Sequence, residues 1–342
     1  SDINATSSTS PSNEGANDDP TAALLNDADS ASNDVPRVDW RIENRFKWMI
    51  TADGTLVLRI AELSDSNLKY ESWREYTSLI EHVDLSQLDT SRAKDLRNLF
   101  YGCTSLQSVD LSQLDMSNVT SMRGMFTDCK NLKSVNLAGI DTSNVTDMSS
   151  MFSGCKKLGS VDLSAFKTAS VTNTAWMFSG CEVLNSINLS GLDMSNVTDM
   201  SNMFGSCRSL KDINFQGVDT SKVTNMFSMF SGCESLKNID LSDLDTSSTT
   251  NMTLMFDDCK SLDNIDLSKL DTSNVTSMDA MFANCESLSR IDLSNLNASK
   301  VTDMTMMFNY CKALKDANLS NVDASNVTNM ASMFLGCKSL EH

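Results

Sequence analysis

Ten cysteines divide most of the chain into equal lengths. Each lies 26 residues after the one before it, at Cys103, Cys129, Cys155, Cys181, Cys207, Cys233, Cys259, Cys285, Cys311 and Cys337. A period this strict is typical of a repeat architecture, in which every unit is the same structural element. One unit has no second layer to cover its apolar face, so the units are predicted to be stable only when stacked.

The repeated unit reads M-F-x-x-C-x-x-L-x-x-V-D/N-L-S-x-L-D-x-S-x-V-T-x-M-x-x. Val135 and Leu137 alternate with polar residues, which indicates a short strand with one buried face. Val145, Met148 and Met151 follow at spacings of three residues, which favours one face of a short helix. The predicted fold is therefore an α/β repeat protein with one short parallel strand, a turn and a short helical return in each coil.

The N-terminal part differs in composition from the repeats. Residues 1–36 contain seven acidic residues, all three prolines, no Lys or Arg and no aromatic residue, and are predicted to form a disordered acidic linker. Residues 37–82 carry three of the four tryptophans, and a hydrophobic alternation around Asp53-Gly54 predicts a β-hairpin. We interpret this segment as the N-terminal cap that covers the open end of the stack.

The repeats occupy residues 83–340, about ten coils, without a linker after the cap. The last coil is cut off after Cys337 and no C-terminal cap is visible, so the natural chain is expected to continue. Residues 341–342 are interpreted as the remnant of a tag.

Charge and hydropathy exclude several classes of partner. The formal net charge is −18, and nucleic acid or an anionic membrane would instead require clustered Lys and Arg. The sequence has no apolar run long enough for a transmembrane helix, and direct membrane insertion is not expected. No signal peptide opens the chain, so an exported protein would be a mature form.

An enzyme and a cofactor are not expected. His82 and His342 are the only histidines, one at the cap junction and one in the apparent tag, so no Cys-His or Ser-His pair is available for a catalytic site. The carboxylates repeat with the coils and would give ten equal sites. A 26-residue cysteine spacing without nearby histidines is not a zinc pattern either.

The cysteines allow two interpretations. Equivalent Cα atoms in adjacent coils would lie about 4.8 Å apart, which is within the range that a disulfide allows. The cysteines also fall in a buried register, where a free thiol behaves as a small hydrophobic group. A ladder of reduced, inert thiols is the favoured interpretation.

Two rows of acidic residues repeat with the coils. The first occupies the outward strand position, where Asp84, Asp110, Asp162, Asp240, Asp266 and Asp292 alternate with asparagines. This row is either a surface for cations or a basic partner, or a solvated face, which is the favoured reading. The second row includes Asp89, Asp115 and Asp141 and is predicted to accept backbone N–H groups at a turn, with calcium binding as the less favoured alternative.

Trp176 is the only tryptophan outside the cap. If exposed it would be a suitable anchor for a partner, and extra packing over neighbouring coils is the equally weighted alternative. The outward strand positions contain no aromatic residue, so binding by this face should be polar, weak per coil and multivalent. The candidate interaction surface is therefore the Asp row together with Trp176.

The motif C-x-x-L-x-x-V-x-L, followed by Met-Phe before the next cysteine, resembles the leucine-rich repeats of BspA-type bacterial surface proteins. The resemblance covers residues 83–340, and the W…DGTL…W segment is similar to the cap of that family. It implies a right-handed leucine-rich-repeat solenoid, secretion, and attachment to the cell surface or cell wall. It also implies adhesion to a host glycoprotein, mucus, extracellular-matrix protein or other cells.

The function expected from these features is that of a monomeric, non-enzymatic adhesin or protein-interaction scaffold. The alternative is a rigid stalk that binds nothing itself and displays another domain of the full-length protein. The sequence identifies no ligand.

Overall fold

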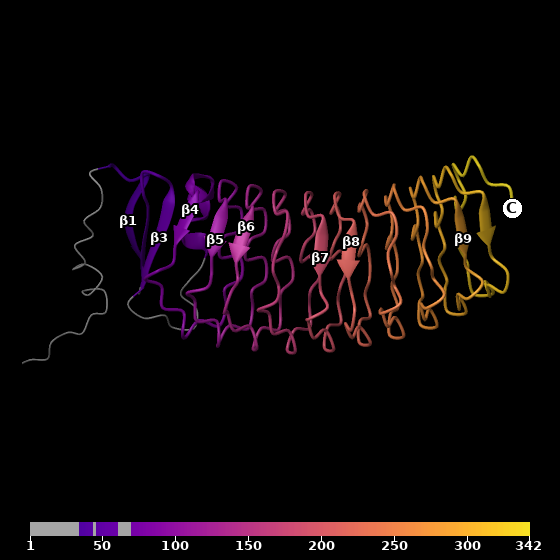
Figure 1. Ribbon diagram of the computed structural model, residues 1–342, viewed down its shortest axis with the longest axis horizontal. Helices are drawn as coiled ribbons and strands as arrows, with labels where there is room; N and C mark the ends of the chain where they lie inside the picture. Colours follow the sequence, from indigo (N-terminus) through magenta and orange to yellow (C-terminus); the bar gives the residue numbers. More distant parts are fainter. Residues whose placement is uncertain (1–33, 44–45, 61–69) are drawn as a thin grey trace, which may run out of the picture.

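The computed structural model describes residues 34–43, 46–60 and 70–342. The predicted linker, residues 1–36, therefore lies outside the described residues except for its last three positions. The repeats form one elongated solenoid whose coils follow each other along the long axis of the molecule (Figure 1).

The N-terminal segment is a four-stranded sheet in the order β1-β2-β3-β4. The strands β2 (Phe46–Ile50) and β3 (Thr55–Ile60) form the antiparallel hairpin predicted around Asp53-Gly54, and β1 (Val38–Glu43) pairs with β2. The first strand of the solenoid, β4 (His82–Asp84), pairs in parallel with β3. The sheet thus passes directly into the first coil.

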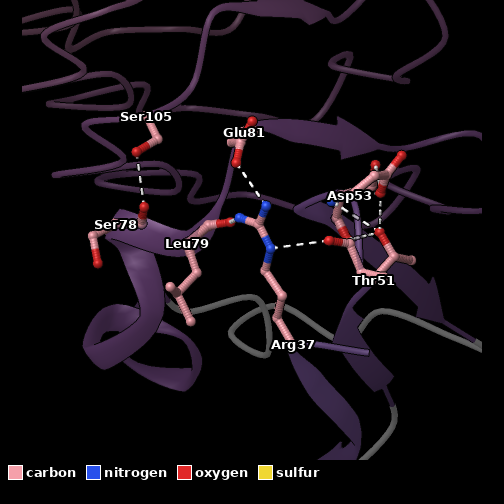
Figure 2. A network of polar contacts seen from close by, with 9 residues as sticks. Arg37, Thr51, Asp53, Ser78, Leu79, Glu81 and Ser105 are labelled. Atoms are coloured by element: carbon pink, nitrogen blue, oxygen red, sulfur yellow. Dashed lines mark hydrogen bonds and ion pairs between the residues drawn. The ribbon is translucent and has the colours of Figure 1, made fainter. Parts of the chain in front are cut away.

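Polar contacts of Arg37 fix this junction (Figure 2). Its guanidinium donates to the carbonyl oxygens of Ala52 and Leu79 at 3.1 and 2.9 Å, and it pairs with Glu81 at 2.8 Å. The carbonyl oxygen of Gly54 also accepts the N–H of Glu81 at 2.8 Å. Arg37 thereby ties the hairpin turn to the residues that enter β4.

Two short 3-10 helices, η1 (Tyr70–Ser72) and η2 (Arg74–Leu79), lie between the hairpin and the first coil. Between them Trp73 is fully buried, with its ring 6.1 Å from that of Trp48. The indole N–H of Trp73 donates to the carbonyl oxygen of Leu99, one coil further on, at 3.2 Å. The aromatic residues of the N-terminal segment are therefore continuous with the core of the solenoid.

The core consists of straight rows of equivalent side chains. One phenylalanine per coil stacks on the next from Phe100 to Phe334, with ring centroids 5.3–5.9 Å apart. The cysteines from Cys103 to Cys311 and the leucines from Leu106 to Leu314 are fully buried in parallel rows. The stacked burial predicted from the 26-residue period is confirmed.

The strands of the solenoid are three residues long. After β4 they are β5 (Ser108–Asp110), β6 (Ser134–Asn136), β7 (Ser186–Asn188), β8 (Asp212–Asn214), β9 (Arg290–Asp292) and β10 (Asp316–Asn318). They pair in parallel and in register only as the doublets β5–β6, β7–β8 and β9–β10. The equivalent residues 160–162, 238–240 and 264–266 form no strand.

The predicted helical return is wrong. Among the described residues only η1 and η2 are helical, and each solenoid coil returns through tight turns. In one coil the N–H of Met125 donates to Met122 and that of Cys129 donates to Phe126, which are three-residue rather than four-residue steps. The residues before these donors, Gly124 and Asp128, have φ of 62° and 59°, as in type II turns.

The alternate N–H groups of this segment leave their own coil. Those of Gly124, Phe126 and Asp128 donate to carbonyl oxygens of the next coil at 2.7–2.9 Å. An α-helix needs all these donors internally, so the ladder between coils and a helix exclude each other. The two left-handed positions recur in every coil, at Asn98 to Ser332 and at Gly102 to Gly336.

A second ladder, not predicted, runs beside these turns. Single-residue parallel bridges connect Asp95, Ser121, Asp147, Asn173, Asp199, Asn225, Asn251, Ser277, Asp303 and Asn329 in one unbroken series. The coils are therefore joined more continuously along the turns than along the strands.

The Phe column gives a test of the stacking. Phe204 is fully buried between two rings, whereas Phe334 in the last coil is only partly buried. We expect Phe204→Ala to lower the free energy of unfolding by about 3–5 kcal/mol, because it leaves a cavity in the column. Phe334→Ala should lower the free energy of unfolding clearly less, as measured by urea unfolding. Equal losses of unfolding free energy in the two variants would contradict the stacked core.

Candidate interaction surface

The predicted Asp row lies at the ends of the solenoid strands. Asp110, Asp162, Asp240, Asp266 and Asp292 are exposed, and Asp84 is half-buried beside Arg59, at 3.3 Å. Asp240, Asp266 and Asp292 form the longest run of this row in consecutive coils without an intervening asparagine, and Asp84 and Asp110 form a shorter one. The five N-terminal and the five C-terminal positions of the row contain three aspartates each.

Each member of this row makes an Asx turn. The backbone N–H of Ser112 donates to Asp110 Oδ1 at 2.8 Å, and the same bond recurs with Ser164, Ser242, Ser268 and Ser294 in their coils. The asparagines of the row accept in the same way, as Asn136 does from Ala138. One oxygen of every carboxylate in the row thus has a structural role, and in Asp84 the second oxygen also pairs with Arg59.

These contacts affect the ionisation of the row. The hydroxyl and the backbone N–H of Ser112 hold the pKa of Asp110 below its usual value, and Ser164 and Ser242 do the same for Asp162 and Asp240. The carboxylates are therefore charged at neutral pH.

Trp176 does not belong to this row. It lies in the turn segment, three residues after the bridge residue Asn173, and its N–H donates to the carbonyl oxygen of Ser201 at 2.9 Å. Its side chain is 45% exposed, and its φ of 63° is unusual for a bulky residue. The predicted surface is thus two separate features, a polar row and an aromatic residue.

The second acidic row makes turns, as predicted. Asp89, Asp115 and Asp141 accept the N–H of the serine two residues on, at 2.9–3.0 Å. A third row was missed: the bridge residues, such as Asp147 and Asp199, accept the N–H two residues on in the same way. The recurrence of Asp, Asn or Ser just before the template Met was the signal for it.

The cysteines are free thiols in the structure. The thiol of Cys129 lies 3.0 Å from the carbonyl oxygen of Phe100, and equivalent thiols repeat this contact along the ladder. Burial raises the pKa of Cys103 and of Cys207 to about 12. The favoured reduced ladder agrees with this structure, and such thiols are poor nucleophiles.

A row of charged residues follows the cysteines by one position. Opposite charges pair between adjacent coils as Lys156 with Glu182 at 2.8 Å, Lys260 with Glu234 at 3.3 Å, and Lys312 with Glu286 at 3.0 Å. Opposite charges facing each other across a ladder are favourable, so this exposed row supports the register of the coils.

The part of the chain that the structure describes contains no group of three or more His, Cys, Asp or Glu side chains that could hold a metal ion. None of its helices is both long enough and apolar enough for a bilayer crossing.

The family described as "Mycoplasma protein of unknown function, DUF285" matches four overlapping segments, residues 70–187, 120–241, 209–317 and 232–342. The chain belongs to this family. The overlapping matches reflect the 26-residue repetition of this DUF285 chain. Together with the solenoid they support its resemblance to BspA-type leucine-rich-repeat proteins.

The solenoid is also similar to solved leucine-rich-repeat structures. A leucine-rich repeat protein from Eubacterium ventriosum is 16% identical, with 89% of this chain and 95% of that chain covered and a TM-score of 0.36. A leucine rich cell surface protein from Faecalibacterium prausnitzii is 17% identical, with 91% and 95% covered and a TM-score of 0.26. These scores identify no function.

The functional domain of InlJ from Listeria monocytogenes, which includes a cysteine ladder, is 16% identical, with a TM-score of 0.18. The match covers 73% of this chain and 59% of that one. No curated protein matches the DUF285 chain.

The thiol ladder predicts selective alkylation. Cys337 is partly exposed, whereas the nine preceding cysteines are buried. In native protein treated with iodoacetamide at pH 8, mass spectrometry should find Cys337 modified first, and the others only after denaturation. Modification of Cys207 at the same rate as Cys337 would show that the ladder is open to solvent.

The Asx turns predict that the stability of the fold decreases at acidic pH. The pKa of Asp110 is lowered in the fold, so its stabilising contribution is present above the ordinary value of 3.8 and is lost as the pH falls below it. Asp110→Ala should lower the Tm at pH 7 by about 2 °C, because the backbone N–H of Ser112 loses its side-chain acceptor.

Asp110→Asn is the matched control, because its side-chain oxygen can still accept the N–H of Ser112. Its Tm at pH 7 should equal that of the wild type. Between pH 7 and pH 3 its Tm should fall by less than the Tm of the wild type. Equal Tm values for the Ala and Asn variants at pH 7 would refute the structural role of the row.

Proposed function

We propose that this DUF285 solenoid is a non-enzymatic interaction scaffold, and specifically an adhesin of the bacterial cell surface. The observation that carries the proposal is the long, rigid array of outward polar groups that repeats from coil to coil. Such an array offers many equal contacts to an extended partner, whereas catalysis would require one coil with unique converging groups.

The proposed partners are host glycoproteins, mucus, extracellular-matrix proteins or other cells. The chain acts as a monomer and is exported and attached to the cell surface or cell wall. The resemblance of its repeats to BspA-type surface proteins supports this location, and the acidic balance of −18 supports partners with basic or neutral surfaces.

The contacts are shared between the two separate features. The Asp row supplies outward carboxylate oxygens on the strand ends, and its Asx turns hold these side chains in fixed orientations. Trp176 supplies an exposed aromatic ring on the turn segment, and indole side chains are over-represented among residues that dominate binding energy. Binding through the row should weaken with salt, because these carboxylates are exposed.

A rigid stalk that displays another domain is the second candidate. The unbroken series of bridges along the turns favours it, because such a ladder stiffens the solenoid along its whole length. A stalk does not bind a partner through its own surface, whereas an adhesin does. A direct binding measurement therefore distinguishes the two functions.

The test is binding of the chain to immobilised mucin, fibronectin and collagen at low and high salt. The triple variant Asp240→Asn, Asp266→Asn and Asp292→Asn keeps the Asx acceptors and removes three charges. We expect it to bind about 10-fold more weakly at low salt and to lose most of the salt dependence.

Trp176→Asn tests the aromatic feature in the same assay. Asn202 occupies the equivalent position of the next coil with φ of 54°, so this change fits the backbone. It should weaken binding about fivefold, whereas the control Tyr310→Gly, at another exposed aromatic residue, should not. Absence of binding to every surface would overturn the adhesin and leave the stalk.

A further inference from the structure

Lysines gather at one edge of the solenoid, between the turns and the strands. The edge positions of each coil lie one, two and four residues after its cysteine. In the coils that start at Cys129 and Cys155 these positions hold four exposed lysines and no acidic residue. Together they form the basic edge: Lys130, Lys133, Lys156 and Lys157. It is a local excess of positive charge in a chain with a formal net charge of −18.

The edge positions face the same side of the solenoid. The residue between the second and the third of them, such as Leu132, is fully buried. An open hollow of about 380 Å³ is lined by edge positions of three successive coils, namely Glu81, Ser105, Gln107, Asn131 and Lys133. Side chains two and four residues after a cysteine therefore border one continuous surface.

Most charges of the basic edge are not neutralised by the chain itself. Lys156 pairs with Glu182 of the next coil at 2.8 Å, and this hydrogen bond, supported by the charge of Lys157, lowers the pKa of Glu182. Lys130, Lys133 and Lys157 form no salt bridge with any residue that the structure describes. Three exposed ammonium groups are thus available to an anionic partner.

The coils hold these lysines close together. The N–H of Lys133 donates to the carbonyl oxygen of Gln107 in the preceding coil at 2.8 Å, which ties the edge into the stack. Lys130 and Lys156 occupy equivalent positions one coil apart, a separation of about 4.8 Å for their backbones. Like charges at this spacing are unfavourable, and a bound anion would offset their repulsion.

The acidic rows do not cancel this local charge. The Asp row lies three residues further along the chain than Lys133, at the other end of a strand about 10 Å long. Exposed charges are screened over about 8 Å at physiological salt, so the row acts weakly on an anion that contacts the lysines directly. Asp128, just before Cys129, is half-buried and leaves the balance of the basic edge positive.

We infer that the basic edge binds a sulfated polysaccharide. Such a polymer carries more than one anionic group on each disaccharide, which matches lysines in adjacent coils. The edge positions of all ten coils contain no aromatic residue, so the stacking platforms that single-stranded nucleic acids use are missing. This surface is separate from the Asp row and from Trp176, and it adds a ligand class that the proposed adhesion does not require.

The experiment measures binding of the chain to immobilised heparin by surface plasmon resonance at low and at physiological salt. Heparin should bind, with an affinity that falls as salt rises, because the lysines are exposed. Hyaluronan, which carries only a carboxylate on each disaccharide, and a single-stranded oligonucleotide should compete more weakly than soluble heparin. Dextran, which is neutral, should not compete.

A triple variant tests the lysines without an ion pair: Lys130→Gln, Lys133→Gln and Lys157→Gln. Its affinity for heparin should fall about 10-fold, through the loss of three exposed charge contacts. The matched control makes the same change at three exposed lysines outside the edge: Lys222→Gln, Lys269→Gln and Lys300→Gln. It alters the net charge equally and should bind heparin like the wild type. A thermal melt verifies that both variants are folded.

Three results overturn the inference. These are no binding of heparin at low salt, equal losses of affinity in the two triple variants, or competition by hyaluronan or the oligonucleotide as strong as that by heparin. Failure of the proposed adhesion is recognised separately. Heparin binding in a chain that binds neither mucin nor matrix protein would leave the basic edge and remove the adhesin, and the reverse result would remove only the basic edge.

Discussion

The hydrogen bonds between the turns of successive coils are the interaction on which the rest of the structure depends. Every second N–H from Gly124 to Asp128 donates to the next coil, and the same pattern recurs along the solenoid. These bonds fix the spacing of the coils, and the spacing in turn lets one phenylalanine, one cysteine and one leucine per coil form continuous buried rows. A single coil has neither the ladder nor a buried core, so its stability comes from its neighbours.

This arrangement determines what the surface can do. Three rows of Asp, Asn and Ser side chains cap backbone N–H groups, so most polar residues that look like binding groups already have a structural contact. What remains for a partner is the second oxygen or the amide group of each side chain, held in a fixed orientation. Binding by such a surface depends on repetition along the axis.

The sequence predicted the stack, the buried rows, the hairpin at Asp53-Gly54 and the turn-forming Asp residues, because each depends on a contact that the period or a short motif dictates. The prediction of a short helix in the return segment of each coil was wrong. Spacings of three residues between Val145, Met148 and Met151 suit a helix and a series of three-residue turns equally. Gly124 and Gly154, at left-handed positions, were the available sign of turns. The single-residue bridges and the pairing of the strands as doublets depend on how closely adjacent coils approach, which no sequence motif determines.

Amide hydrogen exchange of the native chain tests the central claim most directly. The account predicts that the N–H groups of Asn202, Phe204 and Ser206, which donate to the following coil, are strongly protected. Exposed N–H groups outside the ladders should exchange much faster, and protection should be weakest in the last coil, which donates to no coil beyond it in this chain. Exchange of Asn202, Phe204 and Ser206 at the rate of unprotected amides would contradict the ladder between coils, and with it the stacked solenoid.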